Sequence, residues 1–124
     1  MRQIATEKAP AAIGPYCQAM VHNGLVYTSG QIPLDPETGA IVGTNIEEQS
    51  RRVMDNLTAV LAAAGSAPAK ALKTTCFLAD MADFAAFNSI YSEYFTGKPA
   101  RSCVAVRTLP KGVLVEVECV AVVE

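Results

Sequence analysis

Three side chains near the end of the chain, Arg101, Cys103 and Glu116, are of types that can do chemistry. A guanidinium can hold an oxyanion, a thiol becomes a nucleophile once it loses its proton, and a carboxylate can transfer protons. Whether they can act together depends on how the strands that carry them are arranged.

Residues 101–107 and 113–123 are both rich in β-branched side chains and are predicted to form a hairpin. Side chains on a strand alternate between its two faces. Val104 and Val106 should therefore share the helix-covered face with the apolar odd-numbered residues of the last strand. The opposite face would then hold Arg101, Cys103 and Ala105 together with Glu116 and Glu118.

Each of these residues also has a simpler structural interpretation. Arg101 and a glutamate could form an ordinary cross-strand ion pair, worth about 0.2–1 kcal/mol. Cys103 has no histidine nearby to take its proton, and such a cysteine usually acts as a small hydrophobic side chain. Glu118 could be a solvated charge of the strand.

The composition excludes several classes of site. His22 is the single histidine, so three-histidine zinc centres and paired-histidine metal helices cannot form. The four cysteines form no C-x-x-C pair and are expected to be free thiols in a reducing cytoplasm. A net charge of -2 argues against nucleic-acid binding, and the apolar runs are too short to span a membrane.

Turn and cap signals predict the elements of the first half of the chain. Strands at 17–22 and 25–29 should be joined by Asn23-Gly24, a dipeptide typical of two-residue hairpin turns. A helix should begin near Asn45 and end at Gly65. Its apolar stripe is expected to comprise Ile46, Val53, Leu57, Val60, Leu61 and Ala64.

The following segment predicts one more strand and one more helix. Residues 70–80 alternate as a strand, and a helix capped by Asp80 or Asp83 should run to about Phe95. The strand should place Leu72, Thr74, Cys76 and Leu78 on one side, and the helix should bury Phe84, Phe87, Tyr91 and Tyr94.

This order of elements predicts one α+β domain, residues 1–124, with both helices on one face of a mixed sheet. The last strand is apolar on both faces, since Leu114, Val120 and Val122 alternate with the residues expected in the core. Such a strand is normally buried on both sides. The charged fraction of only 18% is also low. We therefore expect a second subunit to cover the uncovered face of the sheet.

Several multi-residue motifs closely resemble the reactive intermediate deaminase family, also called the YjgF-like family. The resemblance runs in order from about Ile4 to Val122. Its motifs are Ala11-Ala12-Ile13-Gly14-Pro15-Tyr16, Thr28-Ser29-Gly30-Gln31-Ile32-Pro33, Pro99-Ala100-Arg101-Ser102-Cys103-Val104, Leu109-Pro110-Lys111 and Val115-Glu116-Val117-Glu118.

The resemblance implies a chorismate-mutase-like α+β protomer that assembles as a homotrimer with active sites between subunits. It implies a cytoplasmic enzyme that hydrolyses reactive 2-imino acids and their enamine tautomers, such as 2-iminobutanoate and 2-iminopropanoate, to 2-oxo acids and ammonia. The resemblance implies that no metal or organic cofactor takes part in that activity.

The resemblance also assigns roles to particular residues. Arg101 matches the family arginine that binds the substrate carboxylate, and Glu116 matches the glutamate that positions and activates water. The remaining matches are expected to be substrate-binding: Tyr16, Ser29, Gly30, Asn88 and Cys103. Cys103 is given a binding role and no thiolate chemistry, and Asn88 could equally be a helix-surface amide.

One departure from the family is visible, and an alternative function remains. Lys98 stands where many members carry an aromatic residue before the proline, in a short connection over 96–99, which leaves the preferred substrate open. The alternative to an enzyme is a non-catalytic sensor of 2-oxo acids or a chaperone-like protein-binding trimer. The older family label of ribonuclease is disfavoured by the acidic charge balance.

Overall fold

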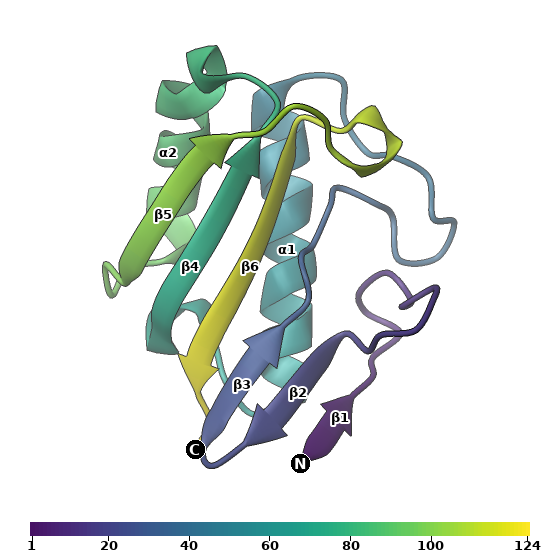
Figure 1. The fold of residues 1–124 in the computed structure, drawn as a ribbon, viewed down its shortest axis with the longest axis vertical. Helices are drawn as coiled ribbons and strands as arrows, with labels where there is room; N and C mark the ends of the chain where they lie inside the picture. The colour runs from purple at the N-terminus through teal and green to yellow at the C-terminus, as the bar shows by residue number, and fades with distance from the viewer.

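A computed structural model describes all residues from Met1 to Glu124. Six strands form one mixed sheet in the order β1-β2-β3-β6-β4-β5, and two helices lie on the same side of it (Figure 1). The strands are β1 (Arg2–Ile4), β2 (Ala19–His22), β3 (Leu25–Thr28), β4 (Ala71–Leu78), β5 (Ala100–Ala105) and β6 (Val115–Val122). The helices are α1 (Ile46–Ala63) and α2 (Phe84–Tyr94). The α+β prediction is confirmed.

The predicted hairpin at the start of the chain is confirmed. Strands β2 and β3 pair antiparallel, and the two residues between them, Asn23 and Gly24, have φ angles of 51° and 75°. Positive φ at both positions is what a tight turn with the twist of a hairpin needs. Strand β1, which pairs with β2, was not predicted, because three residues are too few for an alternation to be recognised.

Helix α1 begins and ends close to the predicted residues. The side chain of Asn45 accepts a hydrogen bond from the Glu48 backbone N–H at 2.9 Å, and the Glu48 carboxylate accepts one from the N–H of Thr44 at 2.9 Å. Gly65, just past the helix, has a φ of 81°, which glycine adopts without strain. All six residues of the predicted stripe are buried in the core.

Strand β4 departs from its predicted alternation at one end. Thr74, Cys76 and Leu78 are buried as expected, but Leu72 is 49% exposed. The pairing of β4 with β6 shifts register between Ala71 and Lys73. This bulge inserts an extra residue, so Leu72 leaves the helix-covered face.

The prediction that the last two strands form a hairpin is wrong. Strand β4 lies between them: it pairs with β5 in parallel and with β6 antiparallel (Figure 1). Strand β5 is thus an edge strand, and the chain passes the end of β4 and runs through the short 3₁₀ helix η3 (Pro110–Gly112) before it enters β6 (Figure 1). Sequence alternation defines the faces of each strand but not which strand is its neighbour.

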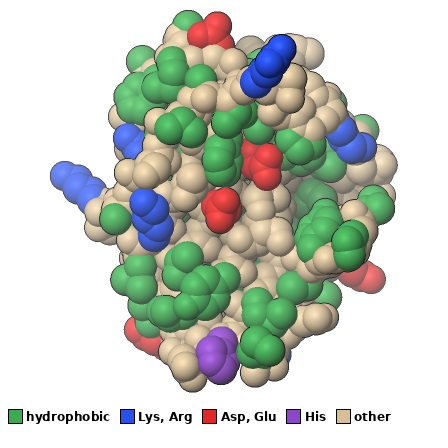
Figure 2. All heavy atoms as spheres, in the orientation of Figure 1, with side chains coloured by type: hydrophobic (Ala, Val, Ile, Leu, Met, Phe, Trp, Pro, Cys, Tyr) green, Lys and Arg blue, Asp and Glu red, His purple; other side chains and the backbone are tan.

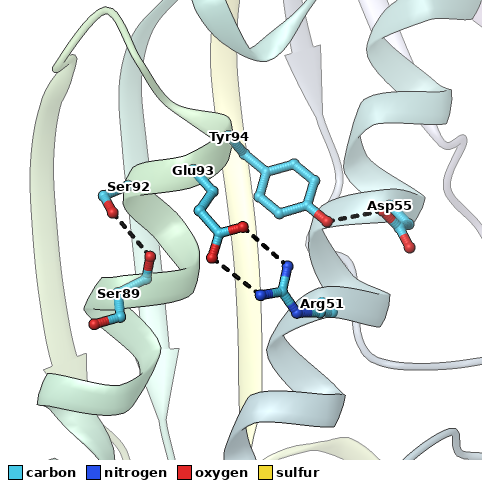
Figure 3. Close-up of polar contacts among 6 residues, drawn as sticks. All are labelled: Arg51, Asp55, Ser89, Ser92, Glu93 and Tyr94. Atoms are coloured by element: carbon cyan, nitrogen blue, oxygen red, sulfur yellow. Dashed lines mark hydrogen bonds and ion pairs between the residues drawn. The ribbon is translucent and has the colours of Figure 1, made fainter.

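A polar clamp on the outer surface joins the two helices (Figure 3). The guanidinium of Arg51 donates two hydrogen bonds to the Glu93 carboxylate, at 3.2 and 3.0 Å, and the Tyr94 hydroxyl donates one to Asp55 at 3.0 Å. Beneath the clamp, α2 buries Phe87 completely and most of Tyr91. These contacts fix the position of α2, and with it Asn88.

Neither helix combines the length and apolar character that a membrane span needs.

Candidate functional site

The arginine expected to share a face with Glu116 lies on the other side of the sheet. In the β4–β5 pair, Arg101 is opposite Thr74 and Cys103 is opposite Cys76. Residues directly opposite one another share a face, and both Thr74 and Cys76 are buried under the helices. The prediction that Arg101 and Cys103 share a face with Glu116 is therefore wrong. Strand β5 pairs with β4 and not with β6, and this pairing determines which of its side chains lie on the helix-covered face.

Arg101 is held by three side chains of α2. Its Nη1 donates a hydrogen bond to Oδ1 of Asn88 at 2.6 Å. Its guanidinium carbon lies 4.7 Å from the centre of the Tyr91 ring and 5.5 Å from that of Phe84. Stacking on aromatic faces suits the flat guanidinium. These contacts keep Arg101 half-buried and leave part of its donor fork free.

The supporting role of Tyr91 and Phe84 was missed by the sequence interpretation, which placed both only in the core. The signal was present in their spacing. Phe84, Asn88 and Tyr91 are separated by four and three residues and so lie on one helix face. The Tyr91 hydroxyl is in turn hydrogen-bonded to Thr74 Oγ1 at 2.7 Å, which fixes the ring under the guanidinium.

Cys103 lies beside Arg101 on the same strand face and is half-buried. Burial raises the pKa of its thiol, although the positive charge of Arg101 and a hydrogen bond with Cys76 act in the opposite direction. A thiol with a raised pKa is protonated at neutral pH and is a poor nucleophile. The geometry gives Cys103 a place next to the arginine without thiolate character.

Glu116 lies on the open face, by which we mean the sheet surface turned away from the helices. Its strand neighbour there is Phe77, and a Cβ atom on residue 30 would overlap the Glu116 carboxylate. Gly30 does not have a positive φ, so glycine is needed here for close approach and not for backbone conformation. Backbone hydrogen bonds between Gln31 and Val117, at 2.9 and 3.2 Å, hold this contact.

The environment of Glu116 favours the protonated acid more than bulk water does. Burial raises the pKa of its carboxyl, and the neighbouring charge of Glu118 raises it further. No side chain donates a hydrogen bond to this carboxylate within the chain, and Glu118 remains exposed. On the open face, acidic side chains lie in the middle of a surface that is otherwise mostly apolar or neutral (Figure 2).

Ser29 directly precedes Gly30 in the chain, and Tyr16 lies in the loop before β2. The two side chains are held in different ways. Ser29 Oγ donates to the carbonyl of Cys17 at 2.7 Å, which ties the end of β3 to the preceding loop. Tyr16 is 56% exposed and lines a cavity of about 400 Å³ formed with the N-terminal segment. Nothing in the chain packs the Tyr16 ring against Arg101 or Glu116.

The single chain thus carries two separate groups of predicted site residues. The cationic group comprises Arg101, Asn88 and Cys103, and the acidic group comprises Glu116, Gly30 and Ser29. Tyr16 belongs to neither group and lines the cavity at the N-terminal segment. The sheet separates the first group from the second. No three histidine, cysteine or acidic side chains lie close enough together to hold a metal ion.

The sequence profile of the family described as Endoribonuclease L-PSP matches residues 6–123, almost the whole chain. The chain belongs to the YjgF-like family of reactive intermediate deaminases, to which that profile corresponds. A 2-iminobutanoate/2-iminopropanoate deaminase from Salmonella typhimurium is 48% identical, over 98% of this chain and 97% of the relative. A protein from Lactococcus lactis named "Putative regulator AldR" is 54% identical, over 100% of this chain and 99% of its own length.

Solved structures of YjgF-like proteins have the same fold. TM0215 from Thermotoga maritima, described as a "putative endoribonuclease", superposes with a TM-score of 0.97 at 48% identity, covering 100% of this chain and 98% of the other. TdcF from E. coli, solved with bound serine, superposes with a TM-score of 0.94 at 41% identity and covers both chains completely. At these identities the YjgF-like fold extends over the entire chain.

Proposed function

We propose that this protein hydrolyses 2-imino acids to 2-oxo acids and ammonia, in a homotrimer whose active sites lie between subunits. One observation carries the proposal. Arg101 and Glu116 are each half-buried and lack an ionic partner, although they lie on opposite faces of the same sheet. Half-buried charges are costly when unpaired. A second copy that brings its acidic group against the cationic group of the first would complete a site.

The reaction needs only groups that the two halves supply. Arg101 would hold the substrate carboxylate by parallel hydrogen bonds, with its plane fixed by Tyr91 and Asn88. Glu116 would accept a proton from water as the water oxygen adds to the imine carbon, and would return it to the departing amine. A carboxyl with a raised pKa is better suited to this exchange near neutral pH than an ordinary glutamate.

The other predicted residues take supporting roles in this proposal. Gly30 permits the Glu116 carboxylate to lie against the backbone, and Ser29 holds that loop in place. Cys103 would contact substrate or water through its backbone, and Asn88 would orient the arginine. Tyr16, exposed on its loop, would form a wall of the cleft once the next subunit is present.

The activity is tested by coupling a threonine dehydratase, which releases 2-iminobutanoate, to a semicarbazide trap. Catalytic amounts of the protein should suppress semicarbazone formation, because the imine is hydrolysed before it is trapped. The same amount of Glu116→Gln protein should not suppress it. Wild-type protein without any effect on the trap would remove this function.

Two substitutions separate the roles of the cationic group. Arg101→Ala should lose about 3 kcal/mol of charge-assisted hydrogen bonding, about a hundredfold in kcat/KM, while Cys103→Ala should keep most of the activity. Near-normal kcat/KM in Arg101→Ala would show that the carboxylate binds elsewhere. Complete loss in Cys103→Ala would require a role for the thiol.

A ligand-binding protein without catalysis is the second candidate, favoured by the relative named as a regulator and by the relative solved with serine. The two candidates differ in what Glu116 does. A sensor would bind 2-oxobutanoate equally well after Glu116→Gln and would never clear the imine, so calorimetric binding combined with the trap assay distinguishes them.

A further inference from the structure

A polar cavity of about 400 Å³ opens between the end of α2 and the start of β5. Arg101 and Asn88 line it, so it is continuous with the cationic group described above. Its remaining polar lining comes from Ser92, Thr96 and Lys98. No aspartate or glutamate lines the cavity.

The cavity therefore holds two positive charges and no negative one. The two ion pairs of the chain join Arg51 to Glu93 and Lys70 to Glu124, and neither involves Lys98 or Arg101. Cations that line a concave surface without a counter-charge create a positive potential there. Such a surface favours a ligand with more than one negative group.

The backbone fixes Lys98 at the rim of this cavity. Its φ angle is 52°, a left-handed conformation that glycine or asparagine would adopt with less strain. Its N–H donates to the carbonyl of Phe95 at 3.2 Å. The preceding residue, Gly97, packs so closely that an added Cβ would lie 3.0 Å from the Ala69 carbonyl oxygen.

We propose that Lys98 binds a second carboxylate on the substrate, so that the enzyme accepts 2-imino dicarboxylates such as 2-iminosuccinate in addition to monocarboxylates. The inference rests on the proposed imine hydrolysis and defines its substrate class. Arg101 holds the carboxylate next to the imine carbon, and Lys98 receives the carboxylate at the end of the side chain. Lys98 is thus a specificity residue and takes no part in the chemical step.

The reaction is the same hydrolysis for both substrate classes. The oxygen of water forms a bond to the imine carbon, the carbon–nitrogen bond breaks, and the nitrogen leaves as ammonia with the protons of water and imine. The product of 2-iminosuccinate is a 2-oxo dicarboxylate. No oxidant or reductant is consumed.

The test compares 2-iminosuccinate with 2-iminobutanoate, each generated by an amino-acid oxidase in the presence of semicarbazide. The quantity measured is the ratio of kcat/KM for the dicarboxylate to kcat/KM for the monocarboxylate. Lys98→Met should lower this ratio about fivefold, as expected for one partly solvated ion pair. Lys98→Arg, which keeps the charge, should retain most of the ratio.

Lys111→Met is the matched control, because Lys111 also has a left-handed backbone, with a φ of 57°, and does not line this cavity. The ratio should not change in this variant. An equal fall in both lysine variants would overturn the inference in favour of a general effect of net charge. A fall in thermal stability of Lys98→Met with an unchanged ratio would overturn it in favour of a helix-end role.

The wild-type protein separates this inference from the proposed function. Hydrolysis of 2-iminobutanoate without hydrolysis of 2-iminosuccinate would overturn only the dicarboxylate specificity. Failure with both substrates would overturn the imine hydrolysis itself and the inference with it.

Discussion

The immediate neighbours of Arg101 and Glu116 determine what each can do. Arg101 has aromatic rings and an amide around it and no carboxylate, so its charge remains available for a ligand. Glu116 lies against a glycine and beside another glutamate, so its carboxylate is crowded but not neutralised. Neither residue has an ionic partner within its own chain.

Gly30→Ala should impair activity more than stability. The new Cβ would displace the Glu116 carboxylate, which is the mobile end of a side chain. The free energy of unfolding should therefore change by less than about 1 kcal/mol, while kcat in the trap assay falls about tenfold or more.

Two controls define the cause of that loss. In a Glu116→Gln background, Gly30→Ala should bring no further loss, because residues that act together are not additive. Gly24→Ala should behave in the opposite way, costing about 1 kcal/mol of stability through its positive φ and leaving kcat unchanged. Additive losses at residues 30 and 116 would contradict the contact as the explanation.

The pH dependence of activity should respond to Glu118. Glu116 must be ionised to accept a proton, so kcat/KM should fall as the pH drops through its raised pKa. Glu118→Gln removes a like charge that raises this pKa. The acid limb of the profile should therefore move to lower pH. Glu47→Gln, on the first turn of α1, should not move it, and an upward shift in Glu118→Gln would contradict the assignment.

At the scale of elements, α2 positions the cationic group and is held in place by a surface ion pair with α1 and by burial of its own aromatic side chains in the core. The Arg51–Glu93 pair is about half exposed on both sides, with side-chain exposures of 50% and 51%. Phe87 is completely buried and stacks at an angle on Tyr91, with ring centres 5.7 Å apart. Because the surface pair is solvated and the ring is buried, the ring should provide most of the stabilisation.

Substitutions at these two positions should differ several-fold in cost. Arg51→Met should lower the free energy of unfolding by less than about 1 kcal/mol, and by less still at high salt. Phe87→Ala should lower it by about 3–5 kcal/mol, because it leaves a cavity in the core. Denaturant unfolding at two salt concentrations measures both, and a cost for Arg51→Met that is large and independent of salt would contradict this division.

At the scale of the whole molecule, the two groups of site residues can meet only if copies associate. The open face, which carries Tyr27, Val120 and Val122 together with Glu116, offers an apolar surface for that association. In a closed ring of identical subunits the same contact repeats at each interface. The cationic group of each copy could then meet the acidic group of the next.

Mixed oligomers test this arrangement. Arg101→Ala and Glu116→Gln proteins, each strongly impaired alone, should regain activity when they are co-expressed with different tags and purified through both tags. In a trimer that contains both proteins, about one site in three would combine an intact arginine with an intact glutamate. Doubly tagged protein that is no more active than the separate variants would show that both residues of a site come from one chain.

The sequence by itself determined most of the local structure and the family. The turn at Asn23-Gly24, the caps of α1 and its apolar stripe depend on residues close together in the chain, so their signals are local. The buried face of β6 followed from simple alternation. The motifs around Arg101 and Glu116 identified the family because they are contiguous and need no knowledge of the fold.

Only the tertiary structure decided how the site residues lie. Strand β4 enters between β5 and β6, a choice that depends on packing between distant segments and leaves no trace in the alternation of either strand. Its parallel pairing with β5 turns Arg101 toward α2 and away from Glu116, and its bulge turns Leu72 outward. Faces of a strand are local properties, whereas the identity of its neighbour is a property of the whole sheet.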